Sequence, residues 1–235
     1  MNKYLKGILI FLGIAFLLFV ILIIFALNKF MQDPFGFDKL KYSSKKELIE
    51  NYELRQREIN ELFLFAKNIT NDGNKYVQIE FTNNKELDMF FVEMDSAAIE
   101  KMKSEYAVQP AYWREGDWNL KINSQKVDTL LDYLDWTREM LKILKTKLDA
   151  ANCISIESNK ISPKSMTVGF KRSGMGMYFY KLFDEPLTDS LVNKYNDGCT
   201  YIFYKDNIVL EYGGGAIGMQ CFETYGDKEH DNSTE

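Results

Sequence analysis

An uninterrupted apolar segment near the N-terminus constrains this chain more than any other feature of its sequence. Residues 7–27 read GILIFLGIAFLLFVILIIFAL and contain no charged side chain. As a helix, this segment would extend roughly 31 Å, which matches a hydrocarbon core of about 30 Å. Backbone groups in lipid must be satisfied internally. We therefore predict a transmembrane helix over residues 7–27, bracketed by Lys6 and Lys29.

The competing interpretation of this segment is a cleaved signal peptide. Such peptides have an apolar region of about 7–15 residues and small residues at the cleavage site. The apolar run here is longer, and 26–28 is a weak cleavage site. We predict a retained, single-pass signal-anchor after a short tail, residues 1–6. The flanking lysines give no clear orientation. Because a signal-anchor with so short a tail usually leaves it in the cytoplasm, we expect the body of the chain to be extracytoplasmic.

The rest of the chain divides into three parts. Residues 28–43 contain Asp-Pro and Phe-Gly-Phe sequences that break helices, so we predict a linker there. Residues 44–225 have the mixed apolar and polar pattern of one globular domain. Residues 226–235, GDKEHDNSTE, are polar, and we predict a disordered tail.

Two long helices and several antiparallel hairpins are predicted inside the domain. Ser44 and Glu47 have capping-box spacing before a helix to about Ile69, and a second helix is predicted over 125–150. Alternating apolar residues predict strands, whereas regular βαβ alternation is missing from the sequence. We therefore predict an α+β fold, an antiparallel sheet packed with two long helices. The predicted strands are 75–82, 87–94, 120–122, 153–158, 165–172, 177–183, 200–205 and 207–212, with short helices at about 96–106 and 187–195.

The predicted helix 45–69 carries an apolar stripe that allows two interpretations. Its members are Leu48, Tyr52, Arg55, Ile59, Leu62, Ala66 and Ile69. Their spacing could form a coiled-coil seam and hence a homodimer through helix 45–69. However, Arg55 interrupts the stripe and the run covers barely three heptads. We favour packing of this helix on its own domain.

Charge and cysteine content exclude several classes of function. The net charge is −5, and Lys3 and Lys6 contribute +2 to residues 1–28, so the remainder carries −7. An acidic body does not suit phosphate backbones, and we predict no nucleic-acid partner. The cysteines lack metal-binding spacing and His230 is the single histidine, so we predict no metal site and no cofactor. If two cysteines pair, Cys199 and Cys221 are favoured because they flank a predicted hairpin.

A glycine run follows the last predicted strand. Residues 213–218 formally match GxGxxG, but too few residues remain for the helix and acidic residue of a dinucleotide site. We predict a bend where two backbone segments approach closely. A backbone contact of Gly213, Gly214 and Gly215 with a ligand is the alternative.

The segment from Tyr112 to Trp118 is the strongest candidate for partner binding. It combines Tyr112, Trp113, Arg114 and Trp118, the residue types that dominate protein interfaces. The alternative is that these aromatic residues close the core beside an ordinary surface ion pair.

Carboxylates on the predicted helix 125–150 are the remaining candidates for chemistry. Asp132, Asp135 and Glu139 are spaced for one helix face, but lysines follow them and a solvated face is the favoured interpretation. The sequence contains no recognisable catalytic set. We therefore predict a membrane-tethered binding or interaction module for another membrane or envelope protein. A membrane-anchored hydrolase using carboxylates and a structural subunit of a membrane complex are the alternatives.

Overall fold

The computed structural model describes residues 43–70, 75–93, 115–159, 164–214 and 218–222, and eight positions between 12 and 23. The chain separates into two compact units, residues 1–41 and residues 42–235. The described positions of the first unit are helical. Within the described residues, no helix has both the length and the apolarity needed to cross a bilayer. Most of the predicted anchor 7–27, the predicted helix 96–106 and the tail 226–235 lie outside them.

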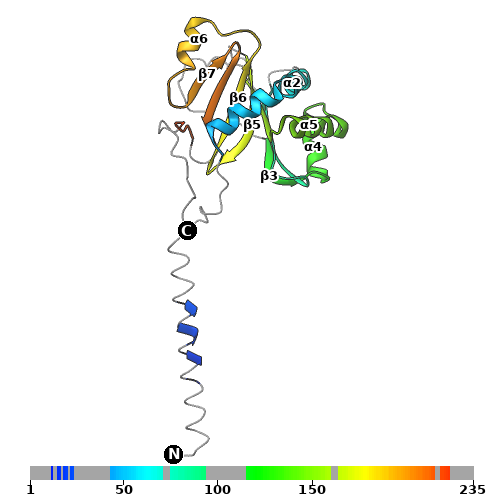
Figure 1. Cartoon of the computed structure of the whole chain (residues 1–235). Helices are drawn as coiled ribbons and strands as arrows, with labels where there is room; N and C mark the ends of the chain where they lie inside the picture. The colour runs from blue at the N-terminus through cyan, green and yellow to red at the C-terminus, as the bar shows by residue number, and fades with distance from the viewer. Residues whose placement is uncertain are drawn as a thin grey trace, which may run out of the picture. The chain divides into compact units, whose positions relative to one another are not determined.

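The second unit is an α+β domain built on one eight-stranded, fully antiparallel sheet (Figure 1). The spatial order of the strands is β3-β2-β1-β4-β5-β6-β8-β7. Most neighbours along the chain pair directly, with two exceptions. Helices α4 (Gln125–Tyr133) and α5 (Arg138–Ala151) carry the chain from the β3 edge to β4 beside β1, and β8 lies between β6 and β7. The strands are β1 (Lys75–Phe81), β2 (Glu86–Glu93), β3 (Glu115–Lys121), β4 (Ser155–Asn159), β5 (Ser165–Ser173), β6 (Gly176–Phe183), β7 (Tyr201–Lys205) and β8 (Ile208–Gly213).

Alternation of side chains along the strands places the main core on one face of the sheet. In β1, Val77, Ile79 and Phe81 are buried on the face that packs against the helices. On the opposite face of this strand, Glu80 is also buried. Its carboxylate receives two hydrogen bonds from Arg172 of β5, at 2.7 and 2.6 Å. A buried carboxylate needs such a partner because desolvation disfavours its charge.

Helix α2 (Lys45–Ile69) begins and ends where the sequence predicts. The Ser44 hydroxyl accepts a hydrogen bond from the Glu47 N–H at 3.1 Å. Arg55, which interrupts the apolar stripe, has φ −131° and kinks the helix. The stripe packs on its own domain rather than remaining free for a second chain. Its fully buried members are Leu48, Tyr52, Ile59, Leu62 and Ala66.

The prediction of one helix over 125–150 is wrong, because the chain breaks between α4 (Gln125–Tyr133) and α5 (Arg138–Ala151). Asp135 adopts a left-handed φ of 57°, and Thr137 caps the new helix. The turn buries Trp136, whose indole N–H donates to the Ile69 carbonyl at 2.8 Å. Carbonyls in the last turn of a helix lack helical partners, so this contact satisfies one at the end of α2. Tertiary contacts thus outweigh the local helical pattern.

Strand β3 is longer than the predicted strand 120–122, because it begins at Glu115. Gly116 has φ 147°, and a Cβ there would lie 2.1 Å from the Met89 carbonyl oxygen. Asn119 also has a positive φ, and the pairing register shifts opposite β2. Glycine and asparagine, residues typical of loops, occupy these irregular positions. The segment therefore resembles a loop in sequence, although its backbone pairs as an edge strand.

The other face of the sheet carries a smaller cluster beneath α6 (Asp189–Lys194), which lies at the end of the sheet away from α4 and α5 (Figure 1). The adjacent edge strand β7 is blocked by its own loop. Asp197 accepts from the N–H of Tyr201 at 2.9 Å, and Asn196 accepts from the N–H of Phe203 at 3.2 Å. Because unpaired edge groups template strand addition, these contacts protect the domain from pairing with another sheet.

Candidate functional site

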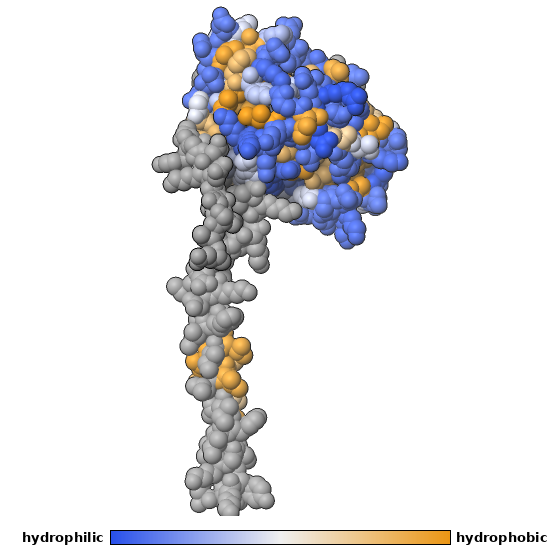
Figure 2. Space-filling model, viewed as in Figure 1, coloured by the Kyte–Doolittle hydropathy of each residue, from blue (hydrophilic) through white to orange (hydrophobic). Residues whose placement is uncertain are grey.

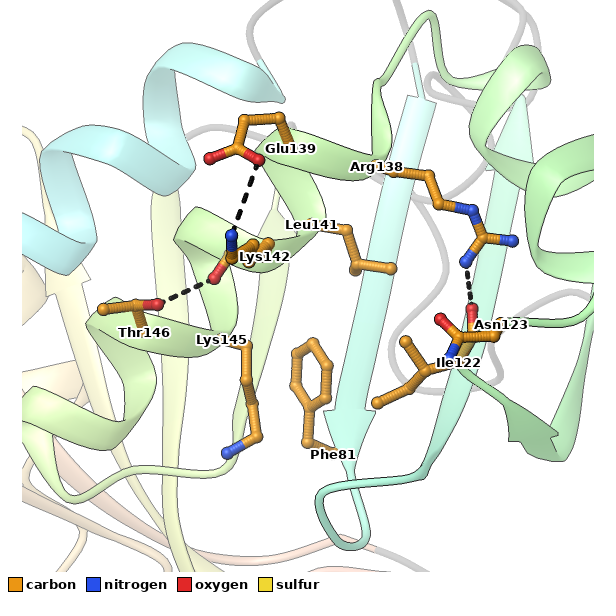
Figure 3. A pocket seen from close by; sticks show the side chains of 9 residues that line it. All are labelled: Phe81, Ile122, Asn123, Arg138, Glu139, Leu141, Lys142, Lys145 and Thr146. Atoms are coloured by element: carbon orange, nitrogen blue, oxygen red, sulfur yellow. Dashed lines mark hydrogen bonds and ion pairs between the residues drawn. The ribbon is translucent and has the colours of Figure 1, made fainter.

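A groove beside α5 is the candidate site of the described domain. Its volume is about 360 Å³. Helix α5 forms one wall, Phe81 lies at the base, and the turn after β3 forms the other wall (Figure 3). We call it the basic groove. Its lining residues are Phe81, Ile122, Asn123, Arg138, Glu139, Leu141, Lys142, Lys145 and Thr146.

The break before α5 creates the basic groove. Thr137 caps a new helix. Arg138, Lys142 and Lys145 follow one another at steps of four and three within its first eight residues. These positions share one helix face. Leu141, between them in sequence, is buried in the core. The groove is therefore basic along one wall and apolar where Leu141, Ile122 and Phe81 line it.

Arg138 is held in place by contacts to the turn before α4 and to the first turn of that helix. Its Nε donates to Asp128 at 2.6 Å, and its guanidinium also donates to the carbonyls of Ser124, at 3.0 Å, and Ile122. The hydrogen bond from Arg138 lowers the pKa of Asp128. In return, the bond to Asp128 raises the pKa of Arg138. Arg138 therefore acts mainly as a rigid part of the wall.

The two lysines of the groove are less constrained. Lys142 is 77% exposed and its ammonium lies 4.0 Å from the Glu139 carboxylate. Lys145 pairs with Asp149 one turn later, and its ammonium lies 5.6 Å from the centre of the Phe81 ring. An incoming anion can compete for the Lys142 ammonium, because exposed ion pairs contribute only about 0–1 kcal/mol. The Lys145 side chain is 22% exposed and is therefore partly shielded from solvent.

The composition of the groove favours binding over acid–base chemistry. Three basic residues line it together with one carboxylate, that of Glu139. Hydrolysis with carboxylates requires a second acid close by. Asp132, Asp135 and Glu139 are all exposed, as expected for a solvated face, and Asp135 lies in the turn rather than on a helix. Among the described residues, no cluster of acids, cysteines or histidine has the makeup of a metal site.

The predicted aromatic site is only partly described. Tyr112, Trp113 and Arg114 lie outside the described residues. Trp118 lies in the edge strand β3 with 63% of its surface exposed, and its ring centre is 4.7 Å from that of Phe90. Phe90 does not belong to the main core beneath the helices, whereas its neighbours Met89 and Phe91 do. The structure therefore does not bring Trp118 into the basic groove.

The glycine run is a close-packed bend in its described part. Gly213 and Gly214 have φ of 150° and 79°, and a Cβ on Gly213 would lie 3.0 Å from the Gly218 carbonyl oxygen. The Gly214 N–H donates to that same carbonyl at 2.8 Å. Gly215 lies outside the described residues, and residues 218–222 form no helix that could receive a phosphate. The contacts support the structural interpretation of the run.

The structure joins Cys199 to Cys221 in a disulfide, the pair that the sequence favours. This bond ties the loop before β7 to the last described residues. There the Phe222 N–H donates to the Cys199 carbonyl at 2.8 Å. The remaining cysteine, Cys153, is buried, and burial raises the pKa of its thiol. Cys153 is thus an unreactive core residue.

Sequence reasoning missed the basic groove because it depends on the helix break. The spacing of Arg138, Lys142 and Lys145 was the one available signal. It identifies a face but not the opposing wall. No match emerges when the chain is compared with protein-family models, with curated proteins or with solved structures. The site is therefore defined by its own geometry, as a groove with basic and apolar lining residues on an α+β domain.

Proposed function

We propose that this chain is a membrane-tethered binding module that recognises an acidic segment of another membrane or envelope protein. The observation that carries this proposal is the basic groove. It presents three basic side chains over an apolar surface, on a chain with a net charge of −5. Against this acidic background, the groove is a local positive site, and such a site attracts an acidic segment of a partner.

The tether follows from residues 7–27, which lack any charge and suit the thickness of a bilayer. The described positions of this segment are helical and carry large apolar side chains that are exposed, such as Phe16 at 70% and Leu22 at 66%. In Figure 2 these positions are hydrophobic, whereas hydrophilic residues dominate the visible face of the domain. An apolar helix exposed in this way is stable in lipid rather than in water.

The disulfide supports an extracytoplasmic domain. Disulfides persist in oxidising compartments and are rare in the cytosol. A domain that contains the Cys199–Cys221 bond is therefore expected on the outer side of the membrane. The short lysine-containing tail before residue 7 would then remain in the cytoplasm.

Washing membranes with alkaline carbonate tests the tether. We expect the full chain to remain in the membrane pellet, because an inserted helix is held by burial of apolar surface and not by charge. A variant with Phe16, Leu18 and Leu22 replaced by aspartate should be released, because each charge at the centre of a helix costs about 2.5–3.5 kcal/mol on insertion. Recovery of the unaltered chain in the wash supernatant would contradict the tether.

A labelled peptide of alternating glutamate and leucine residues tests the groove. Its carboxylates suit Lys142 and Lys145, and its leucines suit Phe81 and Ile122. We expect K142E/K145E to weaken binding by about tenfold or more and to reduce its salt dependence, because two attractive charges become repulsive.

The matched control is K164E/K194E, which makes the same change in net charge at two exposed lysines outside the groove. This control should bind the peptide like the unaltered chain. Equal losses for both variants would mean that only net charge matters, and the groove would be excluded as the binding site.

A further inference from the structure

The outer face of α2 has two exposed leucines that the core does not use. Leu54 is 81% exposed and Leu64 is 61% exposed, whereas the apolar stripe on the opposite side of α2 is buried in the domain. Helix α2 crosses the viewed face of the domain in Figure 1, and the same face shows apolar side chains among hydrophilic ones in Figure 2. Two large leucines on one exposed helix suggest a contact surface.

A pair of opposite charges lies between the two leucines. Arg57 and Glu61 are 80% and 56% exposed, and Arg57 Nε lies 3.9 Å from a Glu61 carboxylate oxygen. Arg57 also pairs with Glu58 at 2.8 Å, and Glu61 with Lys147 of α5 at 3.6 Å. Leu54, Arg57, Glu61 and Leu64 follow one another at steps of three, four and three, so they form a stripe along the outer face. We call these four residues the outer stripe. The kink at Arg55 falls between its first and second members.

The outer stripe is complementary to itself under a two-fold axis. When two copies of a helix run antiparallel about an axis at position 59, each residue faces the one equally far on the other side of 59. Leu54 then faces Leu64 of the second copy, and Arg57 faces Glu61 of the second copy. Glu58 faces Asn60, which can donate a hydrogen bond to a carboxylate. None of these facing pairs brings like charges together.

We propose that two copies of this chain associate through the outer stripes of their α2 helices, packed antiparallel. An interface of this kind is isologous, the type found in most two-fold dimers. It differs from the coiled-coil seam suggested by the sequence, because that seam is buried within each domain. Pairing through β7 is disfavoured, since Asn196 and Asp197 block that edge.

The contact is small, and the proposed tether compensates for this. Four side chains per copy cover less than a standard interface, which buries about 800 Å² per partner. Confinement to one membrane raises the effective concentration of the second copy, so a weak contact suffices. The dimer rests on the proposed tether but not on the basic groove. Loss of peptide binding by the groove would leave the dimer standing, whereas release of the unaltered chain in the carbonate wash would remove its support.

Cysteine crosslinking in membranes tests the arrangement of the two helices. Differently tagged full chains with L54C or L64C are expressed together and oxidised. The native cysteines do not interfere, because Cys153 is buried and the other two are bonded to each other. We expect crosslinks between L54C and L64C chains. Predominant crosslinking of L54C to L54C would show parallel helices, and the absence of any crosslink would exclude the interface.

A charge exchange provides the second test. R57E alone places acids opposite acids in a dimer, and E61R alone places bases opposite bases. We expect each to reduce co-precipitation of differently tagged full chains by about tenfold, because facing like charges are strongly unfavourable. Mixing R57E chains with E61R chains should restore co-precipitation, since opposite charges then face at both positions. Failure of the mixture to associate better than either variant alone would overturn the proposal.

Discussion

Replacement of both Cys199 and Cys221 by serine should lower the free energy of unfolding by about 3 kcal/mol, the loop-entropy contribution expected for a bridge across 22 residues. The bond holds Phe222 beside the rings of Tyr178 and Tyr212, with ring centres 5.5 and 5.9 Å away. Without it, this terminal segment is attached mainly by these ring contacts and by its backbone hydrogen bonds. Urea unfolding of the full chain in mild detergent, followed by near-ultraviolet circular dichroism, measures the loss.

Reduction provides the control for the disulfide prediction. A thiol reductant should shift the unfolding midpoint of the unaltered chain to that of C199S/C221S and leave the double variant unchanged. Because Cys153 is buried and unpaired, it should contribute nothing to this difference. An unaltered chain whose midpoint ignores the reductant, although its disulfide is shown to be reduced, would contradict the prediction.

Replacement of Arg172 by methionine should destabilise the domain by about 3 kcal/mol at neutral pH, because it leaves a buried carboxylate without its counter-charge. Only 7% of the Glu80 side chain is exposed, whereas Arg172 is 45% exposed. Methionine retains most of the length of the arginine stem, so the loss reflects charge and hydrogen bonding more than packing. E80Q/R172M is the matched variant. It removes the buried charge and should recover much of the stability.

The pH dependence of this effect has a definite sign. Burial raises the pKa of Glu80 above its ordinary value of 4.5, and the two contacts with Arg172 oppose this rise. The folded domain therefore binds a proton more tightly than the unfolded chain. Stability from this group is complete below 4.5 and is lost as the pH rises through the folded-state pKa. R172M removes the opposing contacts and raises that pKa further.

The penalty of R172M should consequently be larger at neutral pH than below pH 4.5, where Glu80 is protonated in both states. E80Q/R172M should show little of this difference, because its amide does not titrate. Unfolding curves of the three chains at the two pH values measure the effect. A penalty for R172M that is independent of pH would show that Glu80 is not desolvated.

Local patterns in the sequence determined much of the domain. Alternation located β1, because a strand buried on one face needs apolar residues at every second position. Strands β5, β6 and β8 are buried on both faces over much of their length, and their sequences are mostly apolar and aromatic. Ser44 located the start of α2, because a hydroxyl there can accept from the first free N–H groups of a helix. The segment 7–27 alone leads to the proposed tether, since its length and lack of charge are properties of the sequence itself.

Other features were decided only by tertiary structure. The chain breaks before α5 because Trp136 gains a buried place and a hydrogen bond at the end of α2. Glu80 is buried because β5 brings Arg172 two strands across the sheet. The basic groove exists because that break sets α5 opposite the turn after β3. In each case the deciding contact is with a part of the chain outside the local segment. The free energy of that contact is therefore not reflected in the local pattern of residues.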